Sequence, residues 1–171
     1  SATEFPNAFH RIGHGYHVYD FLTRVPFAVT GPGVPSEGRV SDQVRSVDIF
    51  PTLLDAAGVD RPADVSGQNI LSGPIDHRPA HVRAVGASGE RERWLDGVRY
   101  EGWKYVQGRD RELCQLFDLD SDPKELENVA EEYPEVVERL RGVVDEHVAR
   151  ERQLETASAS EGAEQRMTDR L

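Results

Sequence analysis

The 171-residue sequence has little of several things, and each shortage excludes a class of protein. With one cysteine it can form neither an internal disulfide framework nor a cysteine-based zinc cluster. No apolar run approaches the roughly 18 residues that a transmembrane helix needs. No phosphate-cradling P-loop, G-x-G-x-x-G or G-x-S-x-G motif occurs either. The common nucleotide-binding and serine-hydrolase signatures are therefore absent.

A leader sequence is also not visible, because the opening residues SATEFPNAFHRIGHG are polar. With no signal peptide and no spanning helix in view, a cytoplasmic location is favoured. The chain begins with Ser1 and not with Met, so we also expect that an upstream segment is missing.

Lysine is scarce and acid is abundant. Lys104 and Lys124 are the only lysines among 20 basic residues, against 31 acidic ones and a net charge of −11. Residues 109–171 alone hold 18 acidic and 9 basic side chains. Such a surface repels phosphate backbones, so we expect no nucleic-acid partner, and we expect no membrane partner. It resembles the halophilic surface of proteins from salt-loving organisms, and a GC-rich genome is the alternative explanation.

The first half of the chain carries α/β-type signals. Residues 24–30 (RVPFAVT) form a short apolar run before Gly-Pro-Gly, typical of a strand that is buried on both faces. Residues 46–58 predict a helix with a Gly stop, whose apolar face would hold Ile49, Leu53 and Ala56/Ala57. Residues 59–80 are rich in Pro and Gly and predict a loop or crossover.

The second half changes style. Alternating polar and apolar residues across 81–118 predict an antiparallel meander that is solvated on one face. A helix with Pro134 in its first turn is expected next, with an apolar stripe at Val136/Val137, Leu140, Val143/Val144 and Val148. Residues 155–171 lack periodicity and are predicted to be disordered.

The densest cluster of chemistry-bearing side chains is at the N-terminus, where His10, His14 and His17 fall within eight residues. Neutral imidazole ligates metals and donates to anionic oxygens, and the neighbouring glycines would allow close approach. A polar, disordered terminus explains the same residues equally well.

Three other features have plainer explanations. Asp76-His77 is expected in a solvated turn, and Cys114 in a buried, inert position. The run of alternate carboxylates from Asp118 to Asp122 begins like a calcium loop. It lacks the Gly and Glu that an EF-hand requires, so a turn followed by a helix start is the better interpretation.

Several phrases together resemble the sulfatases of the alkaline-phosphatase superfamily, in the family's order. They are HGYHVYD (14–20), RVPF (24–27) and GPG (31–33), then SDQVRSVDIFPTLLDAAG (41–58), VSGQNIL (65–71), VRYEGWKYV (98–106) and LFDLDSDPKELENVA (116–130). The match runs from about residue 10 to residue 148 and covers the C-terminal portion of the family.

This resemblance implies an α/β fold class, which is α+β within this chain alone. Residues 1–80 would be the C-terminal edge of the α/β catalytic domain. Residues 81–154 would be the family's small antiparallel-sheet subdomain with its packed C-terminal helix, and residues 155–171 a disordered tail.

The resemblance also implies sulfate ester hydrolysis by a formylglycine nucleophile beside a Ca²⁺ ion. The C-x-P-x-R motif that makes this nucleophile is absent, since Cys114 is followed by Gln-Leu-Phe and Ser72–Asp76 ends in Asp. The family's metal-binding motifs are absent as well. We therefore expect no metal on this chain and no hydrolysis by it alone. His14 matches the family residue that faces the sulfate, whereas Arg24 is expected to form a structural ion pair, with Asp48 as a candidate partner.

Three hypotheses remain open at this stage. The chain is the C-terminal fragment of a sulfatase acting on a small-molecule or saccharide sulfate ester, a non-catalytic remnant that binds a partner, or a part of a phosphate or phosphonate ester hydrolase of the same superfamily.

Overall fold

The computed structural model describes residues 15–32, 34, 38–85, 94–109 and 112–168, the last eleven by backbone alone. Residues 1–23 and 81–171 form one compact unit, the sheet unit, and Arg24–Ala80 form a second, the helix–loop unit. Residues 15–23 therefore group with the sheet and not with the segment that follows them.

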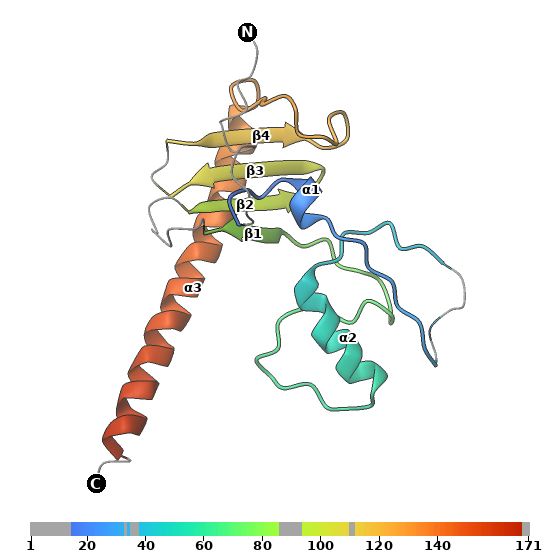
Figure 1. Ribbon diagram of the computed structural model, residues 1–171, viewed down its shortest axis with the longest axis vertical. Coiled ribbons are helices and arrows are strands. Elements are labelled where there is room, and N and C mark those ends of the chain that lie inside the picture. Colours follow the sequence, from blue (N-terminus) through green and yellow to red (C-terminus); the bar gives the residue numbers. More distant parts are fainter. Residues whose placement is uncertain (1–14, 33, 35–37, 86–93, 110–111, 169–171) are drawn as a thin grey trace. The chain divides into compact units, whose positions relative to one another are not determined.

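The sheet unit is built on an antiparallel meander in the order β1-β2-β3-β4 (Figure 1). The strands are β1 (Ala80–Ala84), β2 (Leu95–Tyr100), β3 (Trp103–Gly108) and β4 (Cys114–Asp118). Tyr100 pairs with Trp103 across a two-residue turn, and Trp103 pairs with Asp118. Both turn residues have positive φ, 50° at Glu101 and 80° at Gly102, as a tight hairpin requires. The predicted meander is confirmed.

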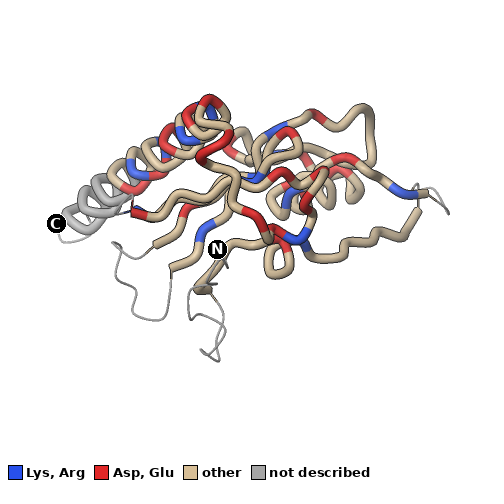
Figure 2. Tube along the Cα trace, turned by 90° about the horizontal axis from the view of Figure 1, so that it is seen from above, with Lys and Arg blue, Asp and Glu red and all other residues tan. Residues whose placement is uncertain are grey.

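One face of this sheet is covered by α3 (Pro134–Thr168), which begins at its proline. The predicted stripe is confirmed: Val137, Leu140, Val144 and Val148 are all buried, Leu140 with 0% exposed. They pack against the sheet residues Val98, Tyr105 and Leu116. Acidic and basic residues also occur along the part of the helix that Figure 2 colours.

The C-terminal end of α3 corrects a prediction. The helix continues to Thr168, through most of the segment expected to be disordered. Residues 155–168 include Ala, Glu, Gln, Arg and Met, which are good helix formers, and extending an existing helix avoids the cost of nucleating one. Among the helices that the structure describes, none is both long and apolar enough to cross a membrane.

The other face of the sheet is not solvated, contrary to the sequence prediction. Residues 15–19 and the short helix α1 (Asp20–Thr23) lie across it. Val18, Ala84 and Val106 form a second buried cluster there. A Cβ at Gly97 would lie 3.1 Å from Val18, so glycine at this position lets the covering segment approach the strand. Residues 15–23, and not solvent, therefore cover the polar residues on this face.

The helix–loop unit contains the 3₁₀ turn η2 (Ser46–Asp48) and helix α2 (Ile49–Ala56), which confirms the predicted helix. Two details of the prediction are wrong. Leu53 is exposed, and the buried side of the helix holds Pro51 and Thr52. Residues 24–30 form no strand, because an isolated strand is not stable and none of the described residues pairs with this segment.

Candidate functional site

The sheet unit contains a buried charged cluster that we name the Lys104 clamp: Asp20, Arg99, Lys104 and Glu125. The Lys104 side chain is fully buried, and its Nζ lies 3.0 Å from Asp20 Oδ1 and 3.8 Å from Glu125 Oε1. Arg99 Nε lies 3.2 Å from Asp20 Oδ2. Asp20 therefore meets a cation with each of its carboxylate oxygens.

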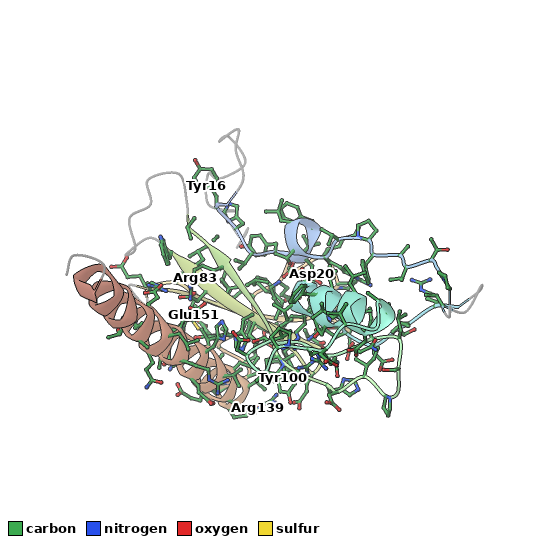
Figure 3. All side chains as sticks on the ribbon, turned by 90° about the horizontal axis from the view of Figure 1, so that it is seen from below. Tyr16, Asp20, Arg83, Tyr100, Arg139 and Glu151 are labelled. Carbon is green, nitrogen blue, oxygen red and sulfur yellow. The ribbon has the colours of Figure 1, made fainter. Side chains whose placement is uncertain are left out.

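The clamp follows from strand periodicity. Tyr105 points to the α3 side of the sheet, so Lys104 before it must point to the other side, which residues 15–23 cover. Asp20, labelled in Figure 3, stands in the first turn of α1 above that face. A lysine buried without partners would be very costly, so the two carboxylates are what makes this position tolerable.

Glu125 joins the clamp from the turn that follows β4. Its Oε2 accepts a hydrogen bond from the backbone N–H of Asp20 at 2.6 Å. Burial raises the pKa of Glu125, although this hydrogen bond and the Lys104 charge oppose the rise. Its φ of 55° is unusual for a residue with a side chain, and the neighbouring contacts must hold it there. Glu125 thus fixes the start of α1 through the backbone.

Tyr19 anchors the chain immediately before the clamp. Its hydroxyl donates to Gln115 Oε1 at 3.1 Å, and its ring meets Phe117 edge-on at 5.9 Å. His17 stacks on Tyr19 with 5.6 Å between ring centroids, and burial lowers the pKa of His17. Burial therefore favours the neutral form of His17.

The predicted sulfate-facing residue, His14, lies outside the described residues, as does His10. Its role stays a prediction. Residues 15–19, which follow His14 in the chain, have no regular secondary structure. Five residues lie between His14 and Asp20, so the clamp and the Tyr19 anchor are close to His14 along the chain.

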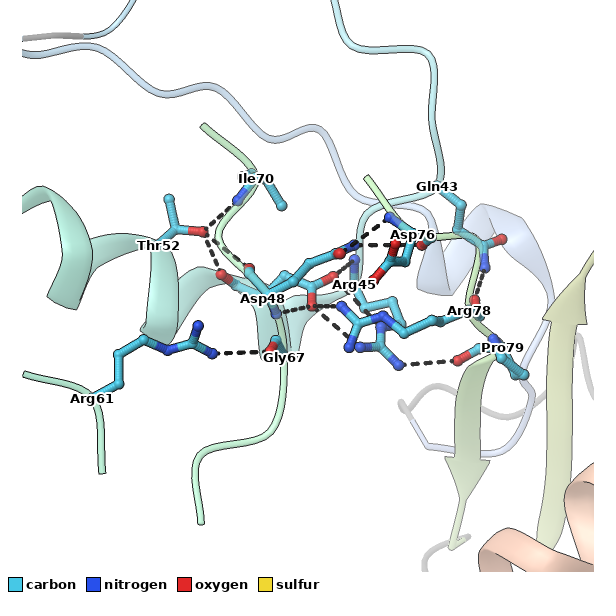
Figure 4. A network of polar contacts seen from close by, with 11 residues as sticks. Gln43, Arg45, Asp48, Thr52, Arg61, Gly67, Ile70, Asp76, Arg78 and Pro79 are labelled. Atoms are coloured by element: carbon cyan, nitrogen blue, oxygen red, sulfur yellow. Dashed lines mark hydrogen bonds and ion pairs between the residues drawn. The ribbon is translucent and has the colours of Figure 1, made fainter. Parts of the chain in front are cut away.

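In the helix–loop unit the main polar cluster surrounds Asp48 (Figure 4). Its carboxylate accepts from Arg78 Nη2 at 3.0 Å and from the backbone N–H groups of Arg45 and Gln68 at 2.8 and 2.9 Å. Burial tends to raise the pKa of Asp48, but the hydrogen bonds from Arg45 and Gln68 outweigh it and lower the pKa below its usual value. The expected Arg24 pairing is replaced by Arg45 and Arg78.

The Asp48 cluster has a structural role. Thr52 continues it by donating to the Asp48 carbonyl at 2.6 Å and accepting from Ile70 N–H at 3.2 Å. The contacts with Gln68, Ile70 and Arg78 tie α2 to the loop at residues 67–79. The Asp48 carboxylate is already occupied by its donors. This leaves Asp48 no capacity for a substrate or a cation.

A third cluster joins the sheet to α3. Arg83 lies 2.5 Å from both Asp96 and Glu151, beside a cavity of about 100 Å³, and Figure 3 shows Arg83 and Glu151 close together. His81 and His147 stack at the same cavity with 3.8 Å between their ring centroids. Because Arg83 occupies both carboxylates, this cluster holds the helix on the sheet.

The remaining positions singled out in the sequence have ordinary structural surroundings. Asp76 and His77 lie in an exposed loop, as expected. Asp118 and Asp122 accept hydrogen bonds within their own turn, which confirms the turn, but the next helix begins only at Pro134. Cys114 is only partly buried, at the edge of the core.

Calcium does not fit the described residues. Nowhere among them do three or more His, Cys, Asp or Glu side chains gather in a way that could hold a metal ion. In the turn at Asp118 to Asp122, the carboxylates of Asp118 and Asp122 accept from backbone N–H groups and from Ser121. No chemical step is therefore assigned to a metal on this chain.

The chain is similar to arylsulfatase K of Bos taurus, with 32% identity over an alignment of 154 positions that covers 80% of this chain and 28% of the bovine protein. Its fold matches a candidate sulfatase of Bacteroides thetaiotaomicron at a TM-score of 0.69 and 25% identity, over 78% of this chain and 31% of the other. The chain belongs to the sulfatase family. No family model matches it.

The sulfatase match has a definite extent. The chain spans less than a third of the curated relatives that it matches, and it corresponds to the C-terminal portion of the family. A phosphonate monoester hydrolase of Agrobacterium radiobacter shares the fold at a TM-score of 0.50 and 29% identity, over 67% of this chain and 26% of that protein. Family likeness alone thus leaves the ester type to be decided.

Sequence reasoning missed the Lys104 clamp of this sulfatase portion. Lys104 stands in the phrase WKYV and Glu125 in DPKEL, both of which carried the family resemblance. One signal was available: Lys104 lies among Trp103, Tyr105 and Val106 in a strand-like phrase, and it is one of only two lysines.

Proposed function

We propose that this chain is the C-terminal portion of a sulfatase that hydrolyses sulfate esters, and that it supplies the support of the active-site loop and not the nucleophile. The similarity to arylsulfatase K carries the proposal. The formylglycine nucleophile and the Ca²⁺ ligands belong to the part of the protein that this chain does not span. The substrate is a small-molecule or saccharide sulfate ester.

In this proposal His14 stabilises the transition state, and the other residues of the chain hold His14 in position. His14 donates to a sulfate oxygen on which negative charge develops in the transition state. The Lys104 clamp and the Tyr19 anchor hold the residues that follow His14 against the sheet. This limits how far His14 can move from its catalytic position. A donor held in place beforehand costs no reorganisation when the ester bond breaks.

Activity measurements test the proposal directly. Purified 1–171 should not hydrolyse a chromogenic aryl sulfate above background, because binding and charge stabilisation without a nucleophile leave little catalysis. In the longer protein, His14→Ala should lower kcat by about 10²–10³-fold with little change in folding. Turnover by the isolated chain that His14→Ala abolishes would refute the division of labour. A kcat within a few-fold of wild type would make His14 scaffold.

The likeness to the phosphonate monoester hydrolase supports a second candidate substrate class. Phosphonate esters carry a similar tetrahedral anion, so the same loop would serve them. The longer protein should be given matched aryl sulfate and phenylphosphonate esters. A higher kcat/KM for the phosphonate would reject the sulfatase assignment in favour of this alternative.

A further inference from the structure

The sheet unit holds a pair of histidines near the point where α3 leaves the sheet. The rings of His81, in β1, and His147, in α3, are nearly parallel, with 8° between their planes and 3.8 Å between their centroids. Val148, next to the pair, is the last buried residue among those of α3 whose side chains are described. Residues 152–157 are all exposed. The pair therefore lies at the outer end of the packed part of the helix.

The charged groups around the pair come from β1, β2 and α3. Arg83, in β1, lies 2.5 Å from both Asp96, in β2, and Glu151, in α3, and Figure 3 labels Arg83 and Glu151. Glu151 Oε1 lies 3.5 Å from His147 Nε2. Asp96 is also 3.1 Å from Arg109. The two carboxylates that line the cavity beside the pair are thus already shared with guanidinium groups.

Protons change the balance of charge at this pair. Histidine is the side chain whose charge normally changes between about pH 5 and 8. Two neutral rings stack without repulsion. A first proton on His147 is balanced by Glu151 beside it. A second proton, on His81, places two positive charges 3.8 Å apart and close to the charge of Arg83. Like charges at this distance repel, so the doubly protonated pair favours separation of the rings.

We propose that His81 and His147 form a pH-sensitive latch for the outer end of α3, closed while the rings stack and open once both carry a proton. β1 is hydrogen-bonded to β2, so His81 keeps its place and the helix is the element that moves. The buried Val148 and the Arg83–Glu151 pair oppose the movement, and they close the latch again when the second proton is lost.

Opening of the latch is local. Leu140 and Val144, earlier in the helix, stay packed in the core. An isolated stretch of helix is only marginally stable in water, so the turns beyond His147 should fray once they leave the sheet. The latch goes beyond the proposed function, because all of its groups belong to the sheet unit and none takes part in ester hydrolysis.

Hydrogen exchange of the α3 amides at residues 148–154 tests the latch in the full chain. Protection factors would be compared at about pH 7.5 and about pH 5.5, toward either end of the range in which histidine titrates. Wild type should lose protection by about tenfold or more at the lower pH, while the Leu140 amide keeps its own. His81→Phe keeps a ring against His147 but removes one charge, so its protection should be equal at both pH values. His77→Phe removes an exposed histidine and should behave like wild type.

Two results would overturn the latch: wild-type protection that does not fall at the lower pH, or an equal fall in His81→Phe. If His81→Phe lowers protection of the Leu140 amide at the higher pH, the core is disturbed, and His147→Phe must then show the pH independence. A titration of wild type followed by nuclear magnetic resonance needs no substitution. The two imidazole signals should lose the shift that each ring imposes on the other as both take up protons. Two charged rings that keep this shift would reject the proposal.

Discussion

The two units of this chain bury opposite kinds of residues. The sheet unit buries Leu140, Val98 and Tyr105 against each other and uses its buried charges, Lys104 with Asp20, to attach one segment. The helix–loop unit buries a polar network around Asp48 and leaves Phe50 and Leu53 exposed. Each unit is stabilised by internal contacts, but only in the sheet unit are these mainly hydrophobic.

This difference teaches where each unit obtains its stability. Apolar burial is the dominant favourable term in folding, whereas buried polar groups contribute little beyond compensating for lost hydration. The sheet unit should therefore be stable in isolation. The helix–loop unit should keep its local shape through Asp48 but open readily, because its apolar area remains in water.

The largest effect is expected from removing the clamp cation. Lys104→Met leaves Asp20 and Glu125 buried with one cation fewer, which should cost about 3–5 kcal/mol of unfolding free energy. Urea unfolding followed by fluorescence reports it, since both tryptophans lie in the sheet unit. Lys124→Met, at the only other lysine, is the matched control and should change nothing measurable. Equal effects of the two substitutions would reject the clamp.

Truncating the core should cost nearly as much. Leu140→Ala removes a fully buried side chain between α3 and the sheet, which should lower the unfolding free energy by about 2–5 kcal/mol. Leu154→Ala, on the same helix but exposed, should stay within about 0.5 kcal/mol of wild type. Comparable losses at both positions would mean that α3 is not packed as described.

Acid should loosen the helix–loop unit through Asp48. Because the folded pKa of Asp48 is lowered, its stabilising contribution is present above the unfolded pKa of about 3.9 and is lost as pH falls through the folded value. The amide signals of Arg45 and Gln68, which donate to Asp48, should shift in that acid range. Asp48→Asn should remove the transition. Signals that do not move down to pH 2 would contradict the assigned network.

The smallest effect, and one of opposite sign, is expected at Glu125. Its raised pKa means that the folded state holds this proton more tightly, so its contribution falls as pH rises from about 4.3 through the folded pKa. Glu125→Gln should remove that slope and cost less than about 1 kcal/mol at neutral pH, because an amide oxygen still accepts from Asp20 N–H. Stability curves against pH for both proteins measure it. An unchanged slope would mean that Glu125 does not titrate in this window.

Periodicity predicted the sheet unit well and the helix–loop unit poorly, for one reason. Alternation in 81–118 and the Leu140 stripe report burial against partners inside the chain, and those partners are present. The pattern at 46–58 reports burial too, but its apolar residues face outward while Asp48 and Thr52 lie inside. Sequence alone shows which residues are apolar and not whether their partner belongs to the same chain.

The candidate site was predictable only in part. His14 came from the family resemblance, and its role stays a prediction because it lies outside the described residues. The clamp needed the structure, because Asp20, Lys104 and Glu125 are far apart in sequence and none of them has a signature by itself. The prediction that one sheet face is exposed was wrong for the same reason, because residues 15–23, which cover this face, are far from the strands in sequence.

Native-state hydrogen exchange measures the contrast between the two units most directly. Amides around Leu140 and Val144 in α3 and in β3 should exchange only through global unfolding of the sheet unit. Amides of α2 near Leu53 should exchange at least about 100-fold faster, through local opening of a helix whose apolar side is unpacked. Equal protection of α2 and α3 would contradict the account, because it would show that the helix–loop unit already has a complete core of its own.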